Sequence, residues 1–385
     1  MEGQPTAHAD ASVLDRRGLD QLIEALRARG YRVVGPTVED SAIVLAELDS
    51  GAQLPSGWGV TTGPGTYRLR RRDDAAVFGH SAGPQSWKRF LHPPRQQQWS
   101  VDREGTFVAP AHDERPYAFV GIRGCDLAAI SVLRRVLCPD PDSDSTTALR
   151  FRKLFIVAAH CTEPGGVCFC ASMGTGPAAG PGYDLALTER IDEHGHRFVV
   201  EVGTESGADV LADVAHRAAA TAEADDARQA VSTATGRMGR AMPDVDLRAL
   251  LRDARGADVW EDVASRCLTC GNCTMVCPTC FCTTSEDVTD LTGEHAERWQ
   301  HWSSCFEPDF SYVHGGNVRT SGESRYRQWM SHKLGTWFDQ FGSSGCVGCG
   351  RCIDWCPVGI DITAEAARLV QVMPAYRPED DREQR

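Results

Sequence analysis

One cysteine pattern occurs twice in this sequence. Each copy reads C-x2-C-x2-C-x3-C-P; the first contains Cys267, Cys270, Cys273 and Cys277, and the second contains Cys346, Cys349, Cys352 and Cys356. In two-cluster iron–sulfur proteins, three thiolates of such a run bind one cubane and the fourth binds the cubane of the other run. The repeated pattern therefore predicts two [4Fe–4S] clusters.

Ligation that crosses between the runs divides the eight thiols into two sets. One cluster is then held by Cys267, Cys270, Cys273 and Cys356, and the other by Cys346, Cys349, Cys352 and Cys277. The alternative is a structural zinc-binding protein, because zinc sites also use C-x2-C pairs. A zinc ion takes four ligands, whereas here three evenly spaced thiols and a fourth before proline occur twice. The pattern therefore favours iron–sulfur clusters.

Four more cysteines lie in the first half of the chain, namely Cys125, Cys161, Cys168 and Cys170. Cys125 and Cys161 each follow a short apolar run, residues 117–124 and 154–160, which we expect to be neighbouring strands. Ligands usually bind at the carboxyl ends of such strands. The four thiols are therefore candidate ligands of a third cluster, with Asp126 as a substitute ligand. The competing interpretation is packing, since free cysteines are often buried.

The remaining cysteines have weaker patterns. Cys280, Cys282 and Cys305 flank the first run; they line the cluster cavity, bind a metal in an unusual arrangement or pack, and packing is favoured. We expect Cys138 in a helix core. The twelve histidines show no metal-binding spacing and receive no role. We find no catalytic triad and no nucleotide fingerprint, so no substrate-converting site is expected.

The elements that must position these thiols indicate an α+β or α/β fold with two domains. Residues 1–240 form a mixed α/β domain: an amphipathic helix at 15–30, strands at 31–35, 41–48 and 66–72, a polar loop at 80–94, the two apolar strands, a hairpin at 183–202 and a surface helical connector at 206–240. Residues 241–375 form a mainly helical dicluster ferredoxin domain, and residues 376–385 are a charged tail.

Composition limits the partners and the compartment. The 40 Lys and Arg residues and 53 Asp and Glu residues give a net charge of -13, which disfavours nucleic acid and anionic membranes. We see neither a secretory signal nor an apolar run long enough to span a membrane. Eleven of the sixteen cysteines follow residue 266, and clustered thiols in a reducing compartment usually bind metal. We therefore expect a cytoplasmic protein.

Six motifs in one order resemble a known family: GPQSWKRFLHPP, FVGIRGCDLAAI, CTEPGGVCFCASMGTGP, CGNCTMVCPTCFC, WSSCFEPDFSYVHGGNVR and GCVGCGRCIDWCPVGIDI. The family is the β subunit of soluble sulfhydrogenase-type NiFe hydrogenases, with the A subunit of anaerobic sulfite reductase as its relative. The resemblance implies that the eight repeated cysteines are cluster ligands. It also implies an electron relay between a flavin subunit that uses NAD(P)H and NiFe hydrogenase small and large subunits, or alternatively a siroheme sulfite reductase subunit.

Overall fold

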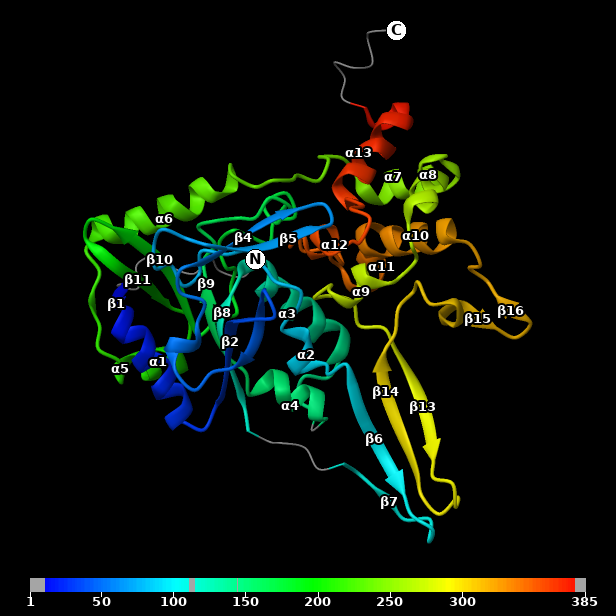
Figure 1. Cartoon of the computed structure of the whole chain (residues 1–385), viewed down its shortest axis with the longest axis horizontal. Coiled ribbons are helices and arrows are strands. Elements are labelled where there is room, and N and C mark those ends of the chain that lie inside the picture. Colours follow the sequence, from blue (N-terminus) through cyan, green and yellow to red (C-terminus); the bar gives the residue numbers. More distant parts are fainter. Residues whose placement is uncertain (1–10, 111–114, 144, 378–385) are drawn as a thin grey trace.

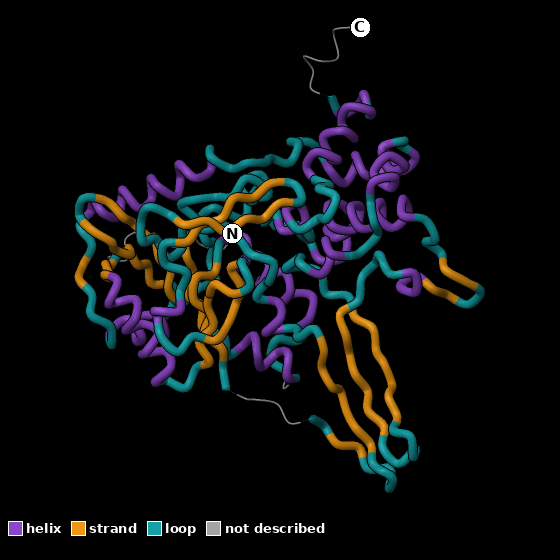
Figure 2. Tube along the Cα trace, viewed as in Figure 1, coloured by secondary structure: helices purple, strands orange, loops and turns teal. Residues whose placement is uncertain are grey.

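The computed structural model describes residues 11–110, 115–143 and 145–377 (Figure 1). The expected charged tail at 376–385 lies almost wholly outside these residues. Figure 2 shows the strands of a large sheet in one half of the molecule and most of the later helices in the other. None of the described helices is long and apolar enough to cross a membrane.

The first half of the chain forms a mixed eight-stranded sheet with strand order β12-β1-β11-β10-β9-β8-β2-β3. The four strands β2, β8, β9 and β10 run parallel, and the outer strands are antiparallel. The predicted strands at 117–124 and 154–160 are confirmed as the adjacent strands β8 and β9. The bounds are β1 (Ser12–Asp15), β2 (Arg32–Glu39), β3 (Ala42–Glu47), β8 (Tyr117–Ile122), β9 (Phe155–Ala159), β10 (Leu185–Asp192), β11 (Gly195–Val202) and β12 (Arg217–Ala218).

Helices cover both faces of this sheet because side chains alternate along its strands. On β8, Val120 packs in the core that contains the buried face of α1, whereas Phe119 packs in the core that contains α3. The predicted helix at 15–30 is confirmed as α1, whose first turn is capped by Asp15 Oδ1 accepting from the Gly18 amide at 2.7 Å. The helices of this half are α1 (Arg16–Ala28), α2 (Lys88–Leu91), α3 (Gly124–Leu137), α4 (Thr146–Arg152), α5 (Glu205–Ala212) and α6 (Thr221–Thr235).

A hairpin from the first half reaches the second cysteine run. It consists of β4 (Trp58–Gly63) and β5 (Thr66–Arg71). At its turn the Gly65 amide donates to the Ile353 carbonyl at 3.0 Å, and the Tyr67 ring lies 5.0 Å from that of Trp355. The hairpin therefore covers the segment between Cys352 and Cys356.

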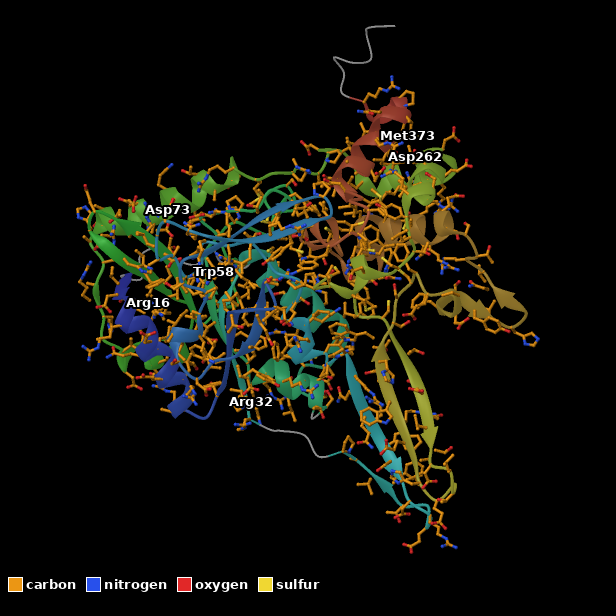
Figure 3. All side chains as sticks on the ribbon, viewed as in Figure 1. Arg16, Arg32, Trp58, Asp73, Asp262 and Met373 are labelled. Atoms are coloured by element: carbon orange, nitrogen blue, oxygen red, sulfur yellow. The ribbon has the colours of Figure 1, made fainter. Side chains whose placement is uncertain are left out.

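The chain after residue 246 forms short helices around a second core. Its largest fully buried side chains include Trp260 and Phe306, which pack with Trp329 and Leu369. Figure 3 labels Asp262 on α8 and Met373 just after α13, where these helices pack together. The elements are α7 (Leu247–Asp253), α8 (Val259–Arg266), α9 (Asn272–Met275), α10 (Gly322–Ser331), a π-helical turn (His332–Thr336), α11 (Trp337–Phe341), α12 (Arg351–Asp354) and α13 (Ile362–Val372).

The expectation of a mainly helical second domain is not confirmed. The segment between the cysteine runs contains the long hairpin β13 (Thr283–Thr289) and β14 (Ala296–Trp302), and also β15 (Tyr312–Val313) and β16 (Gly316–Asn317). In addition β6 (Arg95–Val101) and β7 (Phe107–Val108) from the first half extend the hairpin into a four-stranded sheet that projects from the body (Figure 1). This sheet joins residues on both sides of the predicted boundary at 240.

Candidate metal centres

The two cysteine runs fold alike. In each run the amide two residues after the first cysteine lies near its sulfur: Thr269 N is 3.4 Å from Cys267 Sγ, and Gly348 N is 3.5 Å from Cys346 Sγ. Each run then passes through left-handed conformations, at Thr269 and Gly271 and at Gly348 and Gly350, before one turn of helix, α9 or α12. This shape directs amides toward the sulfur atoms, as an anionic cluster requires.

The first candidate centre combines thiols from both runs. Cys267, Cys270 and Cys273 line one cavity together with Cys356 of the second run, and Cys352 of the second predicted set also borders this cavity. Aromatic and aliphatic side chains close the cavity, and the Ile360 amide lies 3.3 Å from Cys356 Sγ. Cys270 is the only exposed cysteine among the four, so this centre lies near the surface. The structure thus brings together the first predicted set.

The second candidate centre is buried deeper. Burial raises the pKa of Cys346 to about 11 and that of Cys352 well above its usual value, and the negative charge of neighbouring thiolates adds to both effects. Cys277 is among those neighbours. Hydrogen bonds also link Cys277 to the second run, because Cys277 Sγ lies 3.2 Å from Thr279 Oγ1, which donates to the Gly345 carbonyl at 2.6 Å. The structure therefore brings Cys277 next to Cys346, Cys349 and Cys352, the other members of the second predicted set.

A buried lysine lies beside this second set. Lys333 Nζ donates to Thr279 Oγ1 at 2.9 Å and to the Gly345 carbonyl at 3.0 Å. Burial acts to lower the pKa of Lys333, but the nearby thiolates, first of all Cys277, outweigh it and raise this pKa well above its usual value. Lys333 therefore stays charged and favours anions at the second set.

The four cysteines of the first half also come together. Cys125 lies at the start of α3 after β8, Cys161 lies just after β9, and the loop that follows brings Cys168 and Cys170 to the same cavity. Because β8 and β9 are adjacent and parallel, their carboxyl ends meet at one edge of the sheet. This placement agrees with the one predicted for Cys125 and Cys161.

Asp126 does not belong to this cavity. Its two carboxylate oxygens accept from Arg351 Nη1 and Nη2 at 2.7 and 2.9 Å, and both side chains are at least 96% buried. The expectation that Asp126 serves as a substitute ligand is therefore wrong, because both of its oxygens are engaged by the guanidinium group. Arg351 lies between Cys349 and Cys352, so this ion pair joins the sheet domain to the second cysteine run.

His80 lines the same cavity, although no spacing in the sequence singled it out. Burial, helped by the Arg123 guanidinium, lowers the pKa of His80 to about 3, so its ring is neutral. His80 Nδ1 lies 3.1 Å from the Ser81 carbonyl, which assigns the proton to Nδ1. Its Nε2 is buried and has no hydrogen-bond partner within the described part of the chain.

Two glycines bring the third cavity against the second set. The Phe169 amide donates to the Gly348 carbonyl at 2.9 Å, and Cys349 lines the third cavity. A β-carbon at Gly348 would lie 2.6 Å from the Cys170 backbone, and one at Gly350 would lie 2.6 Å from the Val167 carbonyl oxygen. Only glycine allows this approach. Because Cys352 borders the cavity of the first set and Cys349 lines the third cavity, the second set lies next to both.

We expect Gly350→Ala to separate these two segments. The new β-carbon meets backbone atoms and the residue keeps a φ of +81°, so the free energy of unfolding should fall by about 2–4 kcal/mol. Thermal unfolding followed by circular dichroism measures this loss. Gly256→Ala is the control, because nothing lies within 4 Å of its β-carbon position. Equal melting curves for the two variants would contradict the close approach.

The other cysteines fall into two groups. Cys138 is buried at the end of α3, as expected for a core residue. Cys280, Cys282 and Cys305 line a further cavity together with Lys333, Trp329 and Trp337, and Cys305 also packs against the second core. All sixteen cysteines lie within the described residues, and none of them forms a disulfide bond. Among the described residues, no three Cys, His, Asp or Glu side chains lie close enough to share a single metal ion.

The comparisons with known proteins agree with this geometry. Residues 266–360 match the family model of the 4Fe-4S dicluster domain. The chain is similar to sulfhydrogenase 2 subunit beta of Pyrococcus furiosus, with 31% identity over 283 residues, which cover 71% of this chain and 79% of the relative. No solved structure matches the chain. Since the similarity spans most of both proteins and the dicluster domain contains both cysteine runs, this chain belongs to the sulfhydrogenase subunit beta family of iron–sulfur proteins.

Proposed function

We propose that this chain is the iron–sulfur electron-transfer subunit of a cytoplasmic, multisubunit NiFe hydrogenase. In this role it relays electrons between a flavin subunit that uses NAD(P)H and the hydrogenase small and large subunits. The observation that carries the proposal is the cavity in which Cys356 of one run joins Cys267, Cys270 and Cys273 of the other. The name of the Pyrococcus furiosus relative supports hydrogenase as the catalytic partner.

Each candidate set has the donors that a cubane requires. Four thiols per set supply the ligands, backbone amides face the sulfur atoms of Cys267, Cys346 and Cys356, and Lys333 compensates negative charge at the second set. When bound, a [4Fe–4S] cluster takes up and releases one electron at a time, which matches a subunit placed after a two-electron flavin. The residues of this chain hold the clusters, exclude water and fix their order.

We assign a third cluster to Cys125, Cys161, Cys168 and Cys170. The support is that all four thiols line one cavity, which also receives Cys349 of the second set. The nearness of Cys349 gives electrons a route from the second centre to the third. His80 Nε2 adds an unprotonated, neutral nitrogen to the groups in this cavity that can bind iron.

The third centre is tested by Cys168→Ala. We expect anaerobically prepared protein to lose about four iron atoms and four sulfide ions per chain, because a cubane that loses a ligand at a buried site is not retained. Iron and acid-labile sulfide analysis measures the loss, and integrated EPR spectra identify which signal disappears. Cys138→Ala is the matched control, since it removes a buried thiol from a helix core. An unchanged iron content in Cys168→Ala would exclude the third centre.

The partners are tested by isolating the full complex through a tag on this chain. Stoichiometric nickel and flavin in the purified material, with NAD(P)H-linked hydrogen turnover, are the expected result. Siroheme in place of nickel, with sulfite reduction, would assign the chain to the related sulfite reductase instead and overturn the hydrogenase proposal.

A further inference from the structure

Three thiols outside the ferredoxin runs meet at the base of the projecting hairpin. Cys282 immediately precedes β13, and Cys305 follows the end of β14 by three residues. The ladder pairs Thr283 with Trp302, and the Ser303 amide donates to the Cys282 carbonyl at 2.9 Å. Antiparallel pairing therefore places Cys282 opposite Ser303, two residues before Cys305.

These thiols face a cavity of their own. Cys280, Cys282 and Cys305 line it with the indoles of Trp329 and Trp337. The indole nitrogens of both tryptophans are buried and have no hydrogen-bond partner among the residues that the structure describes. An indole N–H is a donor only, so both tryptophans that line this cavity carry an unused donor. This combination suits an occupant that carries acceptor atoms, as the sulfides of a cluster do.

Two buried lysines beside the cavity also favour an anionic occupant. Lys88 is 2% exposed; its Nζ donates to the Cys280 carbonyl at 2.9 Å and lies 3.8 Å from the centre of the Trp302 ring. Lys333, in the π-helical turn, lines the cavity. Neither ammonium forms an ion pair with a carboxylate within the described ranges. Buried positive charges require compensation, and here thiolates are the nearest anionic groups.

Thiols of this cavity lie near one cysteine of each ferredoxin set. Cys280 is within hydrogen-bond reach of Cys277, which belongs to the second set. Cys305 lies near Cys282 and also near Cys273 of the first set. A cluster at this place would therefore be in electronic contact with both predicted cubanes.

We propose that Cys280, Cys282 and Cys305 bind an additional iron–sulfur cluster, separate from the dicluster sets and from the cavity of Cys125. This inference rests on the proposed iron–sulfur function of the chain. Three protein thiolates bind three irons of a cubane and leave the fourth iron for water or a small external ligand. Lys88 and Lys333 would compensate the charge of such a cluster, and the unused indole N–H groups would favour its sulfides as acceptors.

The test compares the full chain with three variants: Cys282→Ala, Cys305→Ala and the triple variant that also contains Cys280→Ala. Each should lose about four iron atoms and four sulfide ions relative to the parent. The triple variant should lose no more than either single variant, because all three thiols serve one cluster. Cys138→Ala should keep the parent content, and circular dichroism verifies that each variant is folded.

Alkylation provides a second measurement that needs no substitution. In the parent, iodoacetamide should leave Cys280, Cys282 and Cys305 unmodified while the protein is loaded with iron, and should modify them after the clusters are removed. Parent iron content in the variants, stoichiometric zinc in the parent lost with these thiols, or alkylation of the loaded protein would each overturn the additional site. A parent without iron or sulfide would instead overturn the proposed function itself.

Discussion

Cys352→Ala should interrupt electron transfer through this subunit. Cys352 belongs to the second set, which lies between the first set and the third cavity, and burial together with the thiolates of Cys346 and Cys349 raises its pKa well above the usual value. Without its thiolate the second cluster loses a ligand, so the complex should lose about four iron atoms per chain. NAD(P)H-linked hydrogen turnover should then fall to background.

Two assays of the complex distinguish electron transfer through this subunit from catalysis in the hydrogenase subunits. The complex is assayed for hydrogen oxidation with a viologen dye, which takes electrons from the hydrogenase subunits directly, and for hydrogen-dependent reduction of NAD(P)+. We expect Cys352→Ala to retain the first rate and lose the second. Cys138→Ala should retain both. A Cys352→Ala complex with an undiminished NAD(P)-linked rate would show that electrons do not pass through the second set.

Arg351→Met should cause the largest loss of stability among single substitutions. It leaves the Asp126 carboxylate buried without its bidentate partner, and removing one member of a buried ion pair costs about 3–5 kcal/mol. It also removes the donor to the Gly83 carbonyl at 3.0 Å. Anaerobic chemical denaturation followed by circular dichroism measures the change in the free energy of unfolding.

Two further variants test whether the loss of stability comes from breaking the buried ion pair. In the double variant Arg351→Met with Asp126→Leu no buried charge remains unpaired, so much of the lost stability should return. The control Arg248→Met breaks an ion pair with Asp339 whose side chains are 51% and 58% exposed, and should cost at most about 1 kcal/mol. A double variant less stable than Arg351→Met, or an Arg351→Met variant no worse than the control, would contradict this account.

Much of the candidate site could be predicted from the cysteine spacing and the strand pattern. Cys356 lines the same cavity as Cys267, as predicted from the repeated run, whose fourth cysteine is expected to bind the cluster of the other run. Cys125 and Cys161 meet because two short apolar runs reliably predict neighbouring parallel strands. In both cases the information is local, so it can be read from a single sequence.

Other features depend on partners that are distant in the sequence. The strands β6, β13 and β14 are rich in polar and charged residues and resemble loops when read alone. β13 and β14 form a local hairpin, but β6 joins them only by pairing with β14 across more than 180 residues. Asp126 and Arg351 are separated by 225 residues, and no local pattern marks them as partners. The shared cavity of Cys282 and Cys305 likewise has no signal in the sequence, because it depends on the hairpin that places Cys282 opposite Ser303.

The most direct test is the anaerobic determination of iron, acid-labile sulfide and zinc in the full chain, combined with EPR after reduction. We predict at least about eight iron atoms and eight sulfide ions per chain, with signals from two magnetically interacting [4Fe–4S] clusters. Colourless protein that contains stoichiometric zinc and no sulfide would contradict the iron–sulfur assignment.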